Sequence, residues 1–246
     1  MNRLLSGVFL LTSAFFLSNS WAVPAWSPVM TLSVGNEWAD AGETQRFYLQ
    51  PDVEKNYVAN RKTDTLLGAE LFIGAEHRLT DSLTGQIGLA IAKSAHTSLQ
   101  GDIWEDADPD FNNYSYAYKI NHSHIAIKGV LLTSMQYGLL PYISASMGVG
   151  FNQAYHFIVT PKIEEETPPP SFENHTRTAF TYTLGVGVRK AINKNWQVGV
   201  GYEFADWGKS QLGSAPQQTV NSGLKLDHLY TQGVFLNLTY SFYPAS

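Results

Sequence analysis

Residues 196–204 read WQVGVGYEF, and bulky apolar side chains fill every even position from Trp196 to Phe204. Glutamine, glycine and glutamate fill the odd positions between them. Alternation with a period of two is typical of a β-strand, because successive side chains of a strand point to opposite faces of its sheet. One face of this strand therefore needs an apolar environment, while the other suits a narrow, polar interior.

Similar alternation recurs along the chain and predicts eight strands, over residues 28–38, 65–79, 83–97, 113–133, 138–158, 176–191, 196–210 and 225–243. The connections between them alternate in length. Long loops are predicted at 39–64, 98–112, 159–175 and 211–224, and short turns at 80–82, 134–137 and 192–195. This alternation is typical of bacterial outer-membrane barrels, whose short turns face the periplasm and whose long loops face outside.

No predicted helix covers the apolar faces, so lipid is the solvent that remains for them. We therefore predict an all-β protein, an eight-stranded antiparallel up-and-down transmembrane β-barrel with short periplasmic turns and long extracellular loops. The aromatic spacing agrees, because ten residues separate Tyr230 from Tyr240. At ~3.3 Å per residue and ~40° of tilt, the two rings lie roughly 25 Å apart, the height of the apolar band of such a barrel.

Residues 1–22 have the features of a secretory signal peptide, with Arg3 before an apolar run and Ser20-Trp21-Ala22 as the cleavage site. We predict that residues 23–246 form a single outer-membrane β-barrel domain after export. The chain contains no cysteine, so a disulfide framework is excluded. Its net charge of −5, with no basic cluster, argues against nucleic-acid binding.

The strand predicted at 113–133 departs from simple alternation. Apolar side chains take even positions from Tyr114 to Ile120 and then odd positions from Ile125 to Leu131. A β-bulge within 121–124 would reset the phase. Alternatively, the tyrosines stand above the membrane, where a strict alternation is not required.

The inward faces of the predicted barrel carry three acids and three bases, namely Glu70, Glu76, Arg78, Lys128, Arg189 and Glu203. Eight strands enclose a lumen that side chains nearly fill, so charges inside it need partners. We hypothesise a structural ion-pair network in the lumen that plugs the barrel, made by Glu70, Glu76, Lys128, Arg189 and Glu203. The alternative is that Arg78 and Arg189 extend to the periplasmic interface.

Three segments resemble the small outer-membrane β-barrel proteins of the opacity-protein and OmpA-barrel type. Residues 141–151, PYISASMGVGF, resemble the fifth strand of that family, and residues 201–208, GYEFADWG, resemble its seventh. Residues 235–242, FLNLTYSF, resemble the aromatic closing strand that the barrel-insertion machinery reads. The resemblance implies a Gram-negative outer-membrane protein with a surface, adhesion or integrity role, and it implies no particular ligand.

The acidic loop 102–110 holds a candidate cation site, because Asp106, Asp108 and Asp110 alternate and could supply oxygen ligands to Ca²⁺. The loop lacks the glycine and distal glutamate of an EF-hand, so a solvated acidic loop is the alternative. His122 and His124 would share one face of a strand and could flank a metal, but no third ligand is evident.

His96 and Ser98 invite comparison with barrel enzymes that hydrolyse lipids through a histidine and a serine. No acid is evident to orient His96, and its parity predicts an inward side chain. We therefore expect no catalytic residue and no cofactor.

The function expected from these features is structural and surface-interacting, through envelope integrity, adhesion or host contact by the extracellular loops, first among them 98–112 and 159–175. The expected partners are outer-membrane lipids and lipopolysaccharide, the barrel-insertion machinery and a surface or host ligand. One alternative is a narrow porin-like channel for ions or small solutes. It gains weight if residues 44–50, which could form a small extracellular hairpin, instead cross the membrane and widen the barrel to ten strands. Further alternatives are a lipid-modifying barrel enzyme and a soluble lipocalin-like carrier.

Overall fold

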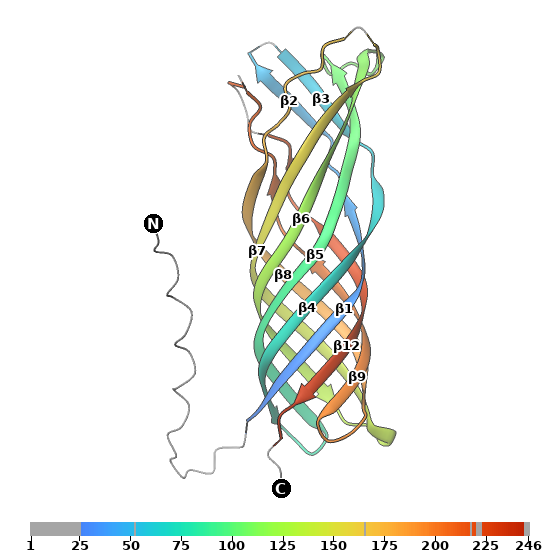
Figure 1. The fold of residues 1–246 in the computed structure, drawn as a ribbon, viewed down its shortest axis with the longest axis vertical. Helices are drawn as coiled ribbons and strands as arrows, with labels where there is room; N and C mark the ends of the chain where they lie inside the picture. Colours follow the sequence, from blue (N-terminus) through green and yellow to red (C-terminus); the bar gives the residue numbers. More distant parts are fainter. Residues whose placement is uncertain (1–25, 52, 165, 217, 220–222, 244–246) are drawn as a thin grey trace, which may run out of the picture.

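The computed structural model describes residues 26–51, 53–164, 166–216, 218–219 and 223–243. Within them, eight inclined strands form a tall cylinder (Figure 1). These strands are β1 (Ser27–Ala41), β4 (Lys62–Arg78), β5 (Leu83–Glu105), β6 (Asn112–Thr133), β7 (Leu139–Pro161), β8 (His175–Ala191), β9 (Trp196–Asp206) and β12 (Tyr230–Ser241). The predicted eight-stranded antiparallel barrel is confirmed. The predicted signal peptide, residues 1–22, lies outside the described residues.

The cylinder closes where the first and last strands meet. β1 pairs antiparallel with β4 on one side and with β12 on the other, so Leu32 lies opposite both Leu71 and Leu238. Closure satisfies the backbone hydrogen bonds of the ring without help from solvent, as a lipid environment requires. In the described part of the chain, no helix combines the length and apolar character needed to cross a membrane.

The two faces of the ring differ as predicted. Trp196, Val198, Val200 and Tyr202 of β9 point outward and are 41–42% exposed, whereas Gly201 faces the lumen and is buried. Large apolar side chains also cover the outside of other strands, as with Leu67, Ile73, Leu89, Ile91, Ile127, Ile143, Met147, Leu184 and Leu236. An exposed apolar wall of this kind suits a hydrocarbon environment.

Glycine in the lumen makes room for the ring of Tyr142. A Cβ atom added to Gly201 would lie 2.0 Å from the Tyr142 hydroxyl oxygen. That hydroxyl accepts a hydrogen bond from the Asn237 amide at 2.8 Å, so the ring spans the lumen toward β12. Small residues at such positions let large polar side chains fill the interior.

Three short connections lie at one end of the barrel, which we call the turn end: residues 79–82, 134–138 and 192–195. The last of these is closed by the Asn193 side-chain oxygen, which accepts from the backbone of Asn195 at 2.9 Å and of Trp196 at 2.8 Å. β12 also finishes at this end, near the C label of Figure 1. The longer connections lie at the opposite, loop end, as predicted.

A hairpin at the loop end extends the barrel wall above the ring of eight strands. It consists of β2 (Gln45–Gln50) and β3 (Val53–Ala59), and β3 pairs with the upper part of β5, where Ala59 lies opposite Gly101 (Figure 1). Of the two possibilities considered for residues 44–50, the hairpin is therefore the one present, and it does not widen the ring to ten strands. A second, short ladder joins β10 (Ser210–Gln211) to β11 (Lys225–Leu226) within the last connection.

The loop predicted at 98–112 is largely strand. β5 continues to Glu105 and β6 starts at Asn112, so the connection is only residues 106–111, which include the short helix η1 (Pro109–Phe111). The strands extend this far because β3 supplies β5 with a new neighbour above the point where β4 begins.

The bulge predicted within 121–124 is wrong. The even positions of β6 face inward without interruption from Tyr114 to Leu132. The extra residues belong to the neighbouring strands: Ala95–His96 of β5 lie opposite Asn121, and His156–Phe157 of β7 lie opposite Tyr118. The apparent change of phase arises because the interior itself becomes apolar toward the loop end.

The bulge on β5 also corrects the predicted orientation of His96, whose side chain is exposed. Asp64 holds this bulge, because its carboxylate accepts from the hydroxyl of Thr97 at 3.2 Å and from the backbone N–H of Ser98 at 2.7 Å. Asp64, the acid near His96 and Ser98, thus stabilises the bulge in β5 through these two hydrogen bonds.

Candidate functional site

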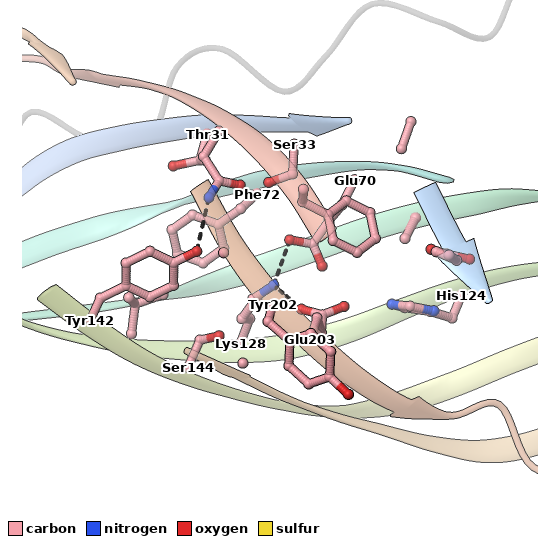
Figure 2. Close-up of a pocket in the computed structure, with 18 of the residues that line it drawn as sticks. Thr31, Ser33, Glu70, Phe72, His124, Lys128, Tyr142, Ser144, Tyr202 and Glu203 are labelled. Atoms are coloured by element: carbon pink, nitrogen blue, oxygen red, sulfur yellow. Dashed lines mark hydrogen bonds and ion pairs between the residues drawn. The ribbon is translucent and has the colours of Figure 1, made fainter. Parts of the chain in front are cut away.

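The centre of the lumen is crossed by a three-residue ion cluster. The Lys128 ammonium on β6 lies 2.6 Å from a carboxylate oxygen of Glu70 on β4 and 3.0 Å from one of Glu203 on β9. Figure 2 shows the Lys128 nitrogen between the two acids, with a dashed line to each. Since charges removed from water need partners, this cluster fixes the distance between three separate strands.

A second polar group lies nearer the turn end. Gln86 donates to Glu76 at 3.0 Å and accepts from Arg189 at 3.3 Å, so the acid and the base are joined through an amide. The Arg189 guanidinium also lies over the ring of Tyr142, 4.8 Å from its centroid. Tyr243 donates a hydrogen bond to the other oxygen of Glu76.

The five charged residues of the hypothesised network thus lie in two groups, one around Lys128 and one around Gln86. Arg78, assigned to the lumen from its parity, is exposed at the turn end. Glu37 is a lumen acid that the sequence analysis left out, and it accepts from the Ser94 hydroxyl at 2.8 Å. The signal that would have found Glu37 is the alternation of β1, whose odd positions from Val29 to Glu37 face inward.

A small cavity of about 40 Å³ remains beside the Lys128 cluster (Figure 2). Its lining includes Glu37, Ser94 and His124. One oxygen of Glu70 and Nε2 of His124 are buried without a protein hydrogen-bond partner. A cavity of this size has room for a few water molecules, which would satisfy those atoms, and for no larger solute.

A histidine pair lies above the ion cluster. His122 and His124 bond to each other at 2.9 Å, and the other ring nitrogen of His122 lies 2.6 Å from the Asn152 side-chain oxygen. The His122 ring stacks on Trp207 with centroids 4.2 Å apart. No cluster of three metal-ligating side chains occurs among the described residues, and these histidines serve packing and hydrogen bonding there.

The loop end is filled by an apolar core, which we call the upper core. It includes Tyr57, Leu99, Ile103, Tyr114, Tyr116, Tyr118, Phe157, Phe172, Trp207, Leu212, Leu224, Leu226 and Leu229. The rings interlock, with Phe157 in edge contact with Phe172 at 4.9 Å and stacked on Tyr116 at 5.9 Å. Burial raises the pKa of the Tyr57 phenol above its ordinary value. The core closes the loop end because leucines of the last connection fold into the mouth.

Asp106, Asp108 and Asp110 do not converge on one point as a cation site would require. Asp108 caps η1, because its carboxylate accepts from the backbone of Asp110 at 3.0 Å. Asp106 and Ala107 have φ angles of 49° and 56°, so they form the tight turn after β5. In the described part of the molecule, the three carboxylates form no group that could hold a metal ion.

The proline-rich connection between β7 and β8 is tied to the barrel rather than freely displayed. Glu166 accepts from the Asn113 amide at 2.9 Å, and the Thr167 carbonyl accepts from the Tyr114 hydroxyl at 3.1 Å. Phe172 is buried in the upper core. This connection therefore presents an ordered surface.

A closed cylinder with an apolar outer wall and a filled polar lumen defines the class of outer-membrane β-barrel proteins. The chain belongs to the outer membrane protein beta-barrel domain family, whose model matches residues 10–242. Its turn end is therefore periplasmic and its loop end extracellular. No curated protein sequence matches the chain.

Several solved structures are similar to it at low sequence identity. The outer membrane protein OprG from Pseudomonas aeruginosa is 10% identical over 89% of this chain and 98% of its own, with a TM-score of 0.49. Neisserial surface protein A is 11% identical over 88% and 97%, with a TM-score of 0.43. The outer membrane protease OmpT from Escherichia coli is 10% identical over 93% and 99%, with a TM-score of 0.46.

Proposed function

We propose that this outer-membrane barrel is a structural scaffold that presents a rigid extracellular surface for contact with other molecules, rather than a channel. The observation that carries the proposal is the occlusion of the lumen along its length. Glu76, Gln86 and Arg189 fill it near the periplasm, the Lys128 cluster crosses its centre, and the upper core fills its mouth. Solute passage requires a continuous polar path, and the cavity of about 40 Å³ is too small to provide one.

The extracellular connections support the surface role. Lys162, after β7, lies 2.8 Å from Asp102 of β5 and also donates to Asn112 at the start of β6. The start of the β7–β8 connection is therefore held against the extracellular ends of β5 and β6. Rigid, pre-ordered loops bind partners at a lower entropic cost than flexible ones.

Two apolar side chains lie next in sequence to Asn112 and Lys162 and are exposed there. Phe111 is 52% exposed and Ile163 is 51% exposed, although both lie outside the lipid-facing wall. Exposed apolar side chains on an ordered polar surface are the usual anchors of protein contacts. They are our candidates for the contact residues.

The purified barrel is expected to show no steady single-channel conductance in planar bilayers. The physical reason is the occluded lumen, because ions would have to displace paired charges from it. A wide porin inserted into the same bilayer serves as the positive control. Reproducible conductance steps from this protein would overturn the scaffold proposal in favour of a narrow channel.

The double variant Phe111→Ser/Ile163→Ser is expected to abolish attachment of barrel-expressing bacteria to epithelial cell monolayers. The matched control is Leu79→Ser/Ile192→Ser, which removes exposed apolar side chains from the periplasmic end and should leave attachment unchanged. Heat-modified migration of each variant on gels checks that the barrel has folded. Equal attachment of expressing and non-expressing bacteria would contradict the adhesive role.

A further inference from the structure

A groove runs across the outer wall at the extracellular end, over β9, β12 and β1. It consists of two hollows, with volumes of about 310 and about 470 Å³, which share Asp40 and Tyr230. The hollow nearer the membrane is lined by Trp38 and Phe204, and the outer one by Arg61, Lys62 and His228. We call this continuous depression the rim groove.

The membrane-side hollow is aromatic. Phe204 and Trp38 flank Gln232 at one height of the wall, because both pair with it in the sheet register. The ring of Tyr230 stacks on Phe204 at 5.8 Å and on His228 at 5.3 Å. Below this level the outward positions of β12 are Val234, Leu236 and Leu238, so the apolar band ends at the groove. Flat rings at this height suit the boundary between acyl chains and a saccharide headgroup.

The outer hollow carries two basic side chains, Arg61 and Lys62, and two acidic ones, Asp40 and Glu43, and each acid accepts a hydrogen bond from the protein. Asp40 accepts from the Thr63 hydroxyl at 2.5 Å, and Glu43 accepts from the backbone of Asp227 at 3.1 Å. Arg61 and Lys62 are exposed, and across the described ranges neither has a carboxylate within 4.0 Å. Arg61 and Lys62 are therefore available to donate charge-assisted hydrogen bonds to an anionic group that approaches from the solvent side.

We propose that the rim groove binds the phosphorylated saccharide headgroup of an outer-leaflet glycolipid. The aromatic hollow receives the saccharide where its acyl chains begin, and Arg61 and Lys62 bind the phosphate. The charge order of the groove matches this ligand, because the cations lie on the solvent side of the rings. An aromatic girdle alone would need neither a depression nor unpaired cations. The proposal goes beyond the scaffold role, which requires only hydrocarbon around the barrel.

The test uses the full barrel refolded in detergent micelles free of lipopolysaccharide, with native mass spectrometry to count bound lipids. The probes are lipid A carrying both phosphates and its dephosphorylated form. We expect one phosphorylated lipid A to bind at least about tenfold more tightly than the dephosphorylated lipid, since charge-assisted bonds to phosphate are worth more than neutral ones.

The variant Arg61→Ser/Lys62→Ser should remove this preference, and Trp38→Leu should weaken the binding of both lipids. The matched control is Lys190→Ser/Lys194→Ser at the periplasmic end, where both lysines are exposed. Equal affinity of the wild-type barrel for the two lipids would overturn the proposal, as would unchanged binding by the Arg61/Lys62 variant. Complete displacement of lipid A by inorganic phosphate would also overturn it, because the groove would then be a simple anion site. The wild-type comparison stands even if a variant fails to fold.

Discussion

Replacing Lys128 with methionine is expected to lower the free energy of unfolding of the barrel by about 3–5 kcal/mol, because removal of one partner leaves buried charges uncompensated. Glu70 and Glu203 are both bonded to Lys128, at 2.6 and 3.0 Å, on strands that lie on different sides of the lumen. Methionine retains much of the length of the lysine side chain, so the loss is electrostatic rather than a loss of packing.

Urea titration of the barrel in lipid vesicles, followed by tryptophan fluorescence, measures this change. Lys194→Met is the matched control, since Lys194 is exposed in the periplasmic turn 192–195 and its substitution should shift stability by no more than about 0.5 kcal/mol. Equal unfolding midpoints for the two variants would show that the central cluster does not hold the strands together.

Replacing Asn152 with leucine is expected to release the last extracellular connection, residues 207–229, from the barrel mouth. Asn152 is fully buried, and its amide donates to the carbonyls of Trp207 at 2.7 Å and Lys209 at 2.8 Å, while its oxygen bonds His122. Leucine has a similar volume and makes none of these bonds. Each buried polar group left without a partner costs about 1–3 kcal/mol.

Limited trypsin digestion reads out this release, because Lys209 and Lys225 lie within the connection. We expect cleavage there to become at least about tenfold faster, since proteolysis follows the population of the locally open state. Gln153→Leu is the control, because the neighbouring Gln153 is exposed on the outer wall. If Asn152→Leu is cut no faster than Gln153→Leu, the connection is held by its leucines alone.

The strand positions could be predicted from the sequence because the bilayer imposes a simple rule on them. Along 196–204 every second side chain must be apolar, and every other one must fit a narrow lumen, so the period is visible without any knowledge of neighbours. The rule weakens above the membrane, where Tyr114, Tyr116 and Tyr118 face an apolar core instead of a polar lumen. An inverted pattern in β6 therefore gave the appearance of a bulge.

The true bulges depend on partners that are distant in sequence. Asp64 on β4 stabilises the bulge at Ala95–His96 through Thr97 and Ser98. The sequence around His96 contains no pattern that predicts this contact. For the same reason the boundary of β5 was placed too early, because the hairpin partner β3 comes from a different part of the chain.

The charged residues of the lumen could be placed inside by parity, and burial implied that they had partners. The alternation of a strand shows which side chains face the lumen, but it does not show which of them bond to one another. Gln86, an uncharged residue, joins Glu76 to Arg189, and the network hypothesis considered only charges. The hydrogen bond of His122 to Asn152 and its ring stacking on Trp207 could not be predicted either, because they join β6, β7 and the last connection.

The eight strands of the ring differ greatly in length, from 23 residues in β5 and β7 to 11 in β9. At ~3.3 Å per residue and ~40° of tilt, a difference of twelve residues corresponds to roughly 30 Å of barrel wall. Above β9 this height is taken up by the last connection, whose Lys225 carbonyl accepts from the Gln45 amide of β2 at 2.6 Å. The extracellular rim is therefore paired strand on the β5–β7 side and largely irregular chain on the β9 side, and an extracellular protease should cut the β9 side first.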